Sequence, residues 1–210
     1  MALLLAATNA LAEEDRGNAF GFYGGPTTYE LISSSDYNGA TSGTSLDLGI
    51  YYARFVTPKF SVRVEARVTE RHADIVQYIA IPASSEPYVL TRVDERFLEF
   101  PLILQADRRA SMGDAEIRIS SGGGLCYGIL IGQELLSPDG LVNDDEGFGG
   151  YQRLSFQFDG GATVDVRSGS AIFLRFRLQY DGYVFGKSDD VPLTTEYLSY
   201  GFYAGFETVF

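Results

Sequence analysis

The sequence contains no tryptophan, one histidine and one cysteine among its 210 residues. The single cysteine, Cys126, excludes an intramolecular disulfide, and its glycine and apolar neighbours predict a small buried residue rather than a reactive thiol. No apolar run reaches the roughly 18–20 residues that a transmembrane helix requires, so a membrane role would depend on strands. No zinc-type Cys/His pattern or nucleotide-binding fingerprint is present, because Gly122-Gly123-Gly124 lies inside a predicted strand. We therefore expect no cofactor and no metal centre.

Positive charge is also scarce. The chain carries a net charge of −12 and a pI of about 4.4, which argues against nucleic acid and other polyanions as partners. Acidic residues gather in predicted surface loops, as at Asp139, Asp144, Asp145 and Glu146. Such oxygen ligands also suit Ca²⁺, but their spacing does not match an EF-hand, so a solvated acidic loop is the favoured interpretation.

The first twelve residues have the pattern of a partial secretory signal peptide. A short apolar core ends at Ala10-Leu11-Ala12, a typical cleavage pattern, and acidic residues follow. The usual basic segment is missing, so a simple N-terminal extension is the alternative. We expect a leader over residues 1–12 and one domain over residues 13–210.

The remaining chain divides into eight strand-like segments. Short turns follow the second, fourth and sixth segments, and longer polar stretches follow the others, as in up-and-down barrels of the outer membrane. The longest polar stretch runs over Gln133–Gly149. The expected strands are Asn18–Leu31, Thr44–Val56, Phe60–Tyr78, Tyr88–Ala106, Ala115–Gly132, Gly150–Val166, Ala171–Gly186 and Glu196–Phe210.

Apolar and polar residues alternate within these segments with the period of two that defines the faces of a strand. Alternation alone does not say which face is inside, and a soluble lipocalin-like carrier would bury the apolar one. Because the polar face mixes arginines with carboxylates, we expect it to line the interior as a paired network. The expected interior charges are Asp47, Arg63, Glu65, Arg67, Glu99, Arg118, Asp159, Arg175, Arg177, Asp181 and Glu207. The predicted fold is an all-β, eight-stranded antiparallel up-and-down transmembrane β-barrel.

Three local patterns strengthen this prediction. They are the segment Leu98-Glu99-Phe100-Pro101-Leu102-Ile103-Leu104, the glycine-rich Ser121-Gly122-Gly123-Gly124-Leu125, and the terminal Phe210. Over about residues 18–210 the chain resembles small bacterial outer-membrane β-barrel proteins, specifically PorT-like and OmpX/OmpA-like barrel domains. The last strand places Tyr200, Phe202, Phe206 and Phe210 on one face, which resembles the assembly signal of such barrels.

This resemblance implies a location in the bacterial outer membrane. The implied partners are outer-membrane lipid, the barrel assembly machinery during biogenesis, and a protein partner at the long loops. We expect a monomer that is not an enzyme and has a structural or interaction role: an envelope anchor, a surface contact or an accessory to an envelope machine. A narrow passive pore is the alternative. A lipid-modifying enzyme would need the only histidine, His72, beside a serine or aspartate, and no spacing in the sequence fixes such a set.

Overall fold

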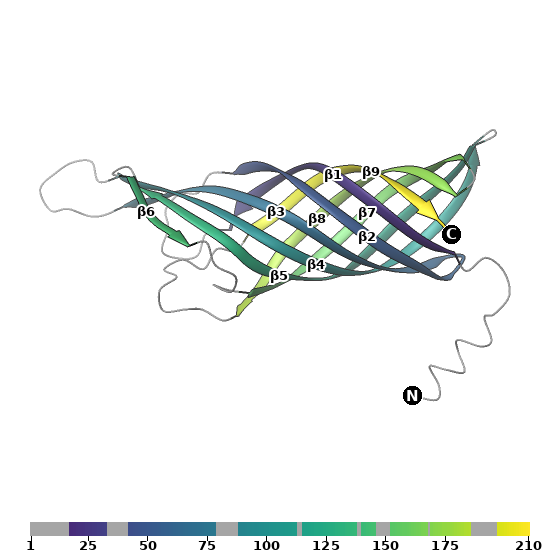
Figure 1. Cartoon of the computed structure of the whole chain (residues 1–210), viewed down its shortest axis with the longest axis horizontal. Helices are drawn as coiled ribbons and strands as arrows, with labels where there is room; N and C mark the ends of the chain where they lie inside the picture. The colour runs from purple at the N-terminus through teal and green to yellow at the C-terminus, as the bar shows by residue number, and fades with distance from the viewer. Residues whose placement is uncertain are drawn as a thin grey trace, which may run out of the picture.

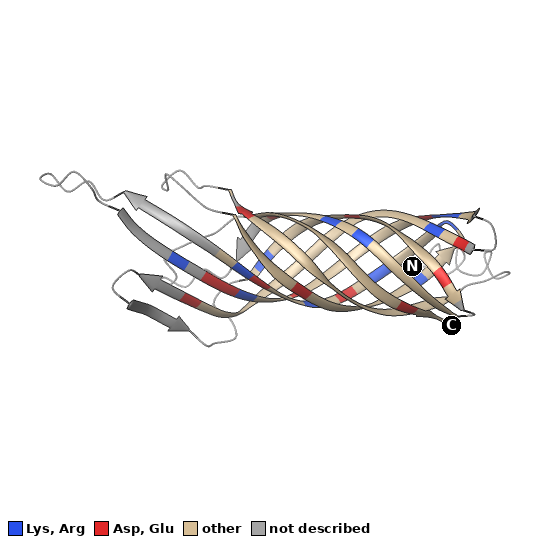
Figure 2. Ribbon diagram, turned by 90° about the horizontal axis from the view of Figure 1, so that it is seen from above, with Lys and Arg blue, Asp and Glu red and all other residues tan. Residues whose placement is uncertain are grey.

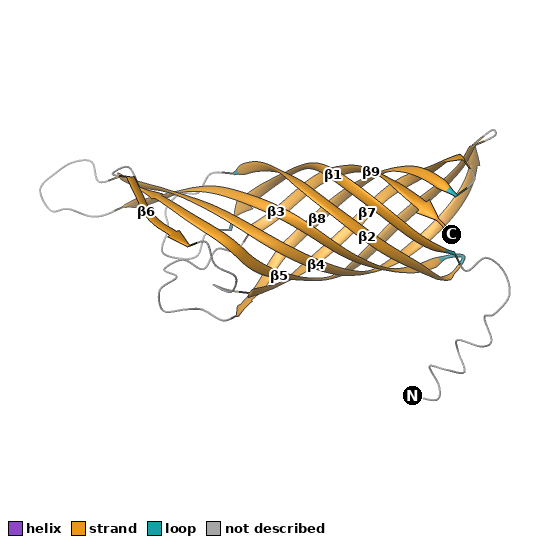
Figure 3. Ribbon diagram, in the orientation of Figure 1, coloured by secondary structure: helices purple, strands orange, loops and turns teal. Residues whose placement is uncertain are grey.

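The computed structural model describes residues 17–32, 42–78, 88–112, 115–137, 140–145, 152–167, 169–185 and 197–210. Almost all of these residues lie in strands, with a short described turn at Pro58 and Lys59 between two of them (Figure 3). Within them, no helix has the length and apolarity needed to cross a membrane. The predicted leader over residues 1–12 lies outside the described residues.

Nine strands make up a single antiparallel sheet (Figure 1). Several of them are much longer than the 9–11 residues that a tilted strand needs to cross a bilayer. The strands are β1 Asn18–Leu31, β2 Gly43–Thr57, β3 Phe60–Tyr78, β4 Tyr88–Met112, β5 Ala115–Ser137, β6 Gly140–Asp145, β7 Gln152–Arg167, β8 Ser170–Phe185 and β9 Tyr197–Val209.

Eight of these strands close into a barrel. Each pairs with its neighbours in the chain, and β1 pairs with β9, as in the register Phe22↔Phe206, so the sheet has no open seam there. The ninth strand, β6, pairs only with the end of β5 that extends beyond the partner strand β7. The barrel is therefore eight-stranded, as predicted, with β6 as an addition outside its wall.

The apolar face of the barrel points outward. Phe22 is 56% exposed and Leu104 is 68% exposed, whereas Arg63 and Glu99 are fully buried. Figure 2 shows the charged residues of the barrel distributed along its strands. An apolar exterior around a charged interior is the arrangement of a transmembrane barrel. It excludes the soluble lipocalin-like alternative.

The structure corrects two predicted boundaries. The turn predicted over Asp107–Asp114 is mostly strand, because β4 continues to Met112 and pairs there with Ala115 of β5. The loop predicted over Gln133–Gly149 contains the end of β5 and all of β6, joined in a hairpin at Ser137↔Gly140. Both segments lie beyond the membrane-spanning wall, where strands pair without the alternating apolar residues that the prediction relied on.

β3, β4 and β5 continue past the barrel at the end opposite the chain termini (Figure 1). The pairing of β3 with β4 extends to Tyr78↔Tyr88, and that of β4 with β5 extends to Arg92↔Leu136. We call this extension, together with the outer rim of the barrel from which it continues, the outer sheet and define it as residues 69–78, 88–97, 130–137 and 140–145. Because both termini and the short turns lie at the other end, that end faces the periplasm and the outer sheet lies outside the cell.

Inside the barrel, glycines on one strand make room for large side chains on the next. Gly21 lies directly opposite Tyr51, and Gly49 lies opposite Tyr23. A Cβ atom on Gly21 would lie 2.4 Å from the Tyr51 ring, and one on Gly49 would lie 2.6 Å from the Tyr23 ring. These two glycines are therefore required by the packing of the interior tyrosines.

Replacing Gly21 with alanine should destabilise the barrel by about 1–3 kcal/mol, because the new methyl group overlaps the Tyr51 ring. The matched control is Gly123→Ala, on the outward face, where the nearest atom to the added carbon would be 3.5 Å away. The measurement is the temperature at which the compact form on unboiled SDS gels is lost. Equal temperatures for the two variants would contradict this account of the packing.

Candidate functional site in the barrel interior

The interior of the barrel holds the largest group of charged side chains in the described residues. All eleven residues that the sequence placed inside are buried, and the most exposed of them, Arg118, is only 9% exposed. In total, seven arginines and eight acidic residues are buried here. They are Arg63, Arg67, Arg71, Arg118, Arg153, Arg175 and Arg177, with Asp47, Glu65, Glu95, Glu99, Asp107, Asp159, Asp181 and Glu207.

Four of these residues form a closed ring of alternating charge. Glu65 Oε1 lies 2.6 Å from Arg63 Nε, and Glu65 Oε2 lies 2.8 Å from Arg177 Nη2. Asp159 completes the ring, with Oδ1 3.1 Å from Arg177 Nε and a second ion pair to Arg63. The Glu65–Arg177 pair joins β3 to β8, which lie four strands apart in either direction around the barrel. The ring therefore spans the interior from wall to wall.

A second cluster lies nearer the outer end and is centred on Glu99. This carboxylate accepts hydrogen bonds from Arg67 Nε at 2.5 Å and from Arg153 Nη2 at 2.6 Å. A third arginine, Arg71, donates to it at 3.1 Å. Asp181 accepts from Arg71 at 2.5 Å and from Arg153 at 2.9 Å, so two carboxylates balance three guanidinium groups.

Aromatic rings also stabilise this outer cluster, in which the arginines outnumber the carboxylates. The Arg71 guanidinium lies 5.0 Å from the centroid of the Tyr29 ring and 4.9 Å from that of Tyr197. Arg153 stacks 3.6 Å from the centroid of the Phe97 ring. Desolvated cations over ring faces gain about 2 kcal/mol or more, so these contacts stabilise the excess positive charge.

Hydroxyl groups are partners of two further carboxylates, Glu207 toward the periplasmic end and Asp47 near the start of β2, toward the outer end. Glu207 accepts a hydrogen bond from Tyr51 and is paired with Arg118. Asp47 accepts only from hydroxyls among the described contacts: from Tyr29 at 2.6 Å, Tyr203 at 2.9 Å and Thr27 at 3.0 Å. Each carboxylate thus has several donors, which a buried charge requires.

The sequence prediction missed several interior residues. Arg71 and Arg153 were not named, although each continues the inward alternation of its strand past the last residue assigned. Four interior tyrosines were also missed, because tyrosine suits either face of a barrel wall and only the opposing glycines mark it as inward. They are Tyr23, Tyr29, Tyr51 and Tyr203.

The residues considered for chemistry outside the interior are not assembled into a site. His72 Nδ1 lies 2.8 Å from Asp94 Oδ1, on the outward face of β3 and β4, and its interactions in the described residues include no serine. No group of three or more potential metal ligands occurs in the described part of the chain. Of the predicted acidic cluster, Asp144 and Asp145 belong to β6, whereas Asp139 and Glu146 lie outside the described residues.

The C-terminal residues predicted as an assembly signal lie along β9 and at its end. Phe202 and Phe210 are strongly exposed on the outer wall, and Tyr200 and Phe206 are partly exposed. The Phe206 ring packs 6.0 Å from that of Phe22 on β1, next to the seam that closes the barrel. These rings belong to the lipid-facing surface, and their role in assembly stays a prediction.

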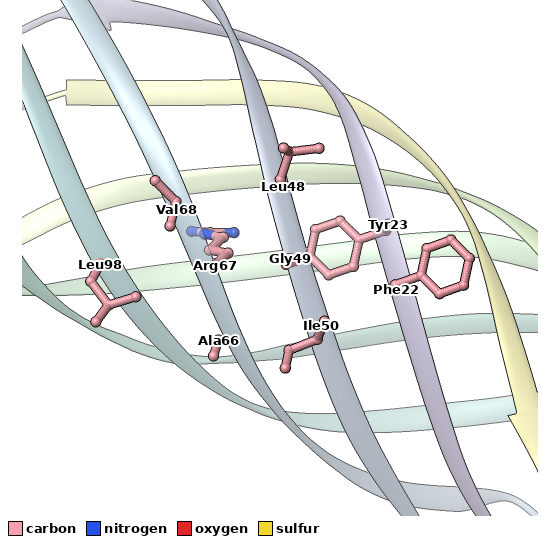
Figure 4. Close-up of a pocket in the computed structure, with 9 residues that line it drawn as sticks. All are labelled: Phe22, Tyr23, Leu48, Gly49, Ile50, Ala66, Arg67, Val68 and Leu98. Carbon is pink, nitrogen blue, oxygen red and sulfur yellow. The ribbon is translucent and has the colours of Figure 1, made fainter.

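A shallow depression lies in the outer wall (Figure 4). Its volume is about 410 Å³, and it lies over β1–β4 around Gly49 and Ala66, where small residues leave the wall thin. Phe22, Leu48 and Ile50 border it. Because these side chains face the bilayer, the depression is part of the lipid-facing surface.

Together, the closed sheet, the apolar exterior and the paired charges inside define a small transmembrane β-barrel of the bacterial outer membrane. No protein-family model matches the sequence, and a search of curated proteins gives no significant match. Solved structures match in fold. One is neisserial surface protein A (TM-score 0.54, 12% identity, covering 92% of this chain and 97% of that chain). Another is OprG from Pseudomonas aeruginosa (TM-score 0.53, 15% identity, covering 93% and 97%).

At these identities the similarity concerns the fold alone. It agrees with the predicted resemblance to small outer-membrane barrels and does not single out PorT-like barrels, which stay a prediction. The fold and the apolar exterior together identify the chain as a bacterial outer-membrane barrel protein.

Replacing Glu99 with glutamine should lower the free energy of unfolding by about 3 kcal/mol or more, because three buried arginines lose their shared counter-charge. The control is Glu70→Gln, which removes an exposed carboxylate 3.0 Å from Arg96 and should cost less than about 1 kcal/mol. Denaturant unfolding from lipid vesicles measures both. Similar losses for the two variants would show that the interior network does not carry stability.

Proposed function

We propose that this protein is a non-catalytic envelope barrel with a closed interior, which anchors the outer sheet and presents it as a contact surface outside the cell. The coarse role, an outer-membrane barrel, follows from the fold. The contact role goes further and has two sources of support, the length of the outer sheet and the filling of the interior.

The outer sheet is the observation that carries this proposal. Crossing the bilayer takes about 9–11 residues of a strand, yet β4 has 25 residues and β5 has 23. The additional residues form a paired sheet rather than single loops, and β6 widens it by another strand. These additional residues do not help to span the membrane, so we assign them a role in contacts outside the cell.

At the base of the outer sheet, contacts on both faces join its strands to one another. On the outward face, Glu70 and Arg96 pair across β3 and β4 at 3.0 Å. On the other face, Gln133 Nε2 donates to Glu95 Oε1 at 3.0 Å, and Phe97 is fully buried. A sheet fixed on both faces presents one defined surface to a partner.

The filled interior favours an anchor over a pore. An eight-stranded barrel has room only for its own side chains. Here the Arg63–Asp159 and Glu65–Arg177 pairs cross that space, so an ion would have to break them in order to pass. We propose that the barrel does not conduct.

The surroundings of His72 support a non-catalytic role. Its side chain is 43% exposed on the outward face, and Asp94 is its partner. A histidine activates a hydroxyl nucleophile only when the two are within hydrogen-bonding distance. Within the described residues, His72 has no such hydroxyl partner.

Reconstituted into planar bilayers, the full chain should show no steady conductance at moderate voltage. The variant Glu65→Ala/Arg177→Ala removes half of the charged ring and should show flickering conductance, because the crossing pairs are lost. A stable conductance from the unmodified chain would contradict the closed interior and support a narrow pore.

The contact role predicts a partner at the outer sheet. A photo-crosslinking amino acid at Arg96, whose side chain is 55% exposed, should give a discrete protein adduct on intact cells. The same amino acid at Leu174, which is 57% exposed on the lipid-facing wall, should give only lipid adducts. If Arg96 gives no protein adduct, or both positions give the same one, the outer sheet is not a contact surface.

A further inference from the structure

At the periplasmic end, two cations lie side by side at the surface. Lys59 occupies the turn between β2 and β3, and Asp107 N donates to its carbonyl oxygen at 2.8 Å. The next residue on β4, Arg108, is thereby brought next to Lys59. Both side chains are exposed, and neither has an ion pair within the described residues.

The neighbouring carboxylate does not neutralise this pair. Asp107 is buried and points into the barrel, where it accepts from Ser61 at 2.8 Å and from Gln105 at 2.7 Å. The Asp107 carboxylate therefore interacts inside the barrel, and the outward surface at Lys59 and Arg108 stays positively charged.

These cations lie where the apolar wall ends. Phe60 follows Lys59 and is 57% exposed, and Ile119, opposite Arg108 in the sheet, is 53% exposed. A third cation, Arg54, lies on the outward face of β2 between exposed apolar residues and also has no ion pair with a described residue. Its long side chain can lie along the wall and extend its guanidinium to the membrane surface.

Two other exposed arginines have carboxylate partners. Arg96 pairs with Glu70 at 3.0 Å at the outer end, and Arg109 pairs with Glu116 at 3.4 Å beyond the periplasmic end of the wall. In a chain with a net charge of −12, Lys59 and Arg108 thus form a local positive pair at the level of lipid headgroups, and Arg54 lies on β2 in the row of Val62 and Leu104. We call these three residues the periplasmic cation group.

We propose that the periplasmic cation group binds the phosphate of an anionic glycerophospholipid in the inner leaflet of the outer membrane. Guanidinium groups form bidentate hydrogen bonds with phosphate oxygens, and the lysine ammonium adds a compact positive charge. The acyl chains lie along Phe60 and Ile119, which continue the lipid-facing wall. The net negative charge of the chain repels polyanions at long range, but a lipid phosphate reaches this group within the membrane plane.

The test compares the lipids that stay with the protein after release from nanodiscs. The full chain is placed in nanodiscs of phosphatidylcholine with a minority of phosphatidylglycerol, and the lipids that remain bound are counted by native mass spectrometry. We expect enrichment of phosphatidylglycerol over its share in the nanodisc. Each cation near an anionic surface contributes about fivefold, so Arg54→Gln/Lys59→Gln/Arg108→Gln should abolish the enrichment.

The control variant Arg96→Gln/Arg109→Gln also removes exposed arginines, but paired ones, and should keep the enrichment. A heat-dependent shift on SDS gels confirms that each variant is folded; if the triple variant does not fold, Lys59→Gln and Arg108→Gln are tested singly and should each reduce the enrichment. No enrichment in the unmodified chain, or equal enrichment in all variants, would overturn the proposal. So would a dependence on these residues seen only when lipopolysaccharide replaces phosphatidylglycerol, because its phosphates lie in the outer leaflet.

Discussion

A sheet inside a bilayer cannot have an open edge, because an unpaired backbone group in hydrocarbon costs several kcal/mol. The pairing of β1 with β9 meets this constraint by joining the ends of the chain into one closed wall. Closure with eight strands then fixes a narrow interior that admits side chains and little else. The wall must be apolar outside, and so the polar residues of every strand face one another across a small space.

That crowding explains the form of the interior network. Charges without access to bulk water need partners, and these include residues on the far wall, as for Glu65 and Arg177. Bulky side chains need gaps, and the gaps come from glycines on adjacent strands, as for Tyr51 and Gly21. Charge balance and volume are thus satisfied together. This combination keeps the interior filled and makes structural stability its main contribution.

The sequence predicted most of the barrel because its strands alternate strictly. The bounds of Phe60–Tyr78 were predicted correctly, since valines and charged residues alternate there and Pro58 marks the preceding turn. The prediction failed at the periplasmic end of β4 and in β6, because contact with lipid no longer requires alternating apolar and polar residues there. The pattern could name interior charges such as Arg63 and Asp159, but not their pairing, because contacts across the barrel depend on tilt and stagger that no single strand encodes.

The two ends of the barrel are free of these constraints, and they differ. Beyond the wall, β4 and β5 can lengthen without the need to place apolar residues on one face, so the outer end has grown into a sheet. The periplasmic end has short turns, and three of its outward cations, Arg54, Lys59 and Arg108, have no ion pair with a described residue. The proposed lipid contact at one end and the outer sheet in water at the other would give the barrel a fixed direction in the membrane. The filled interior stabilises the barrel, so contacts with other molecules are left to its two rims and its outer wall.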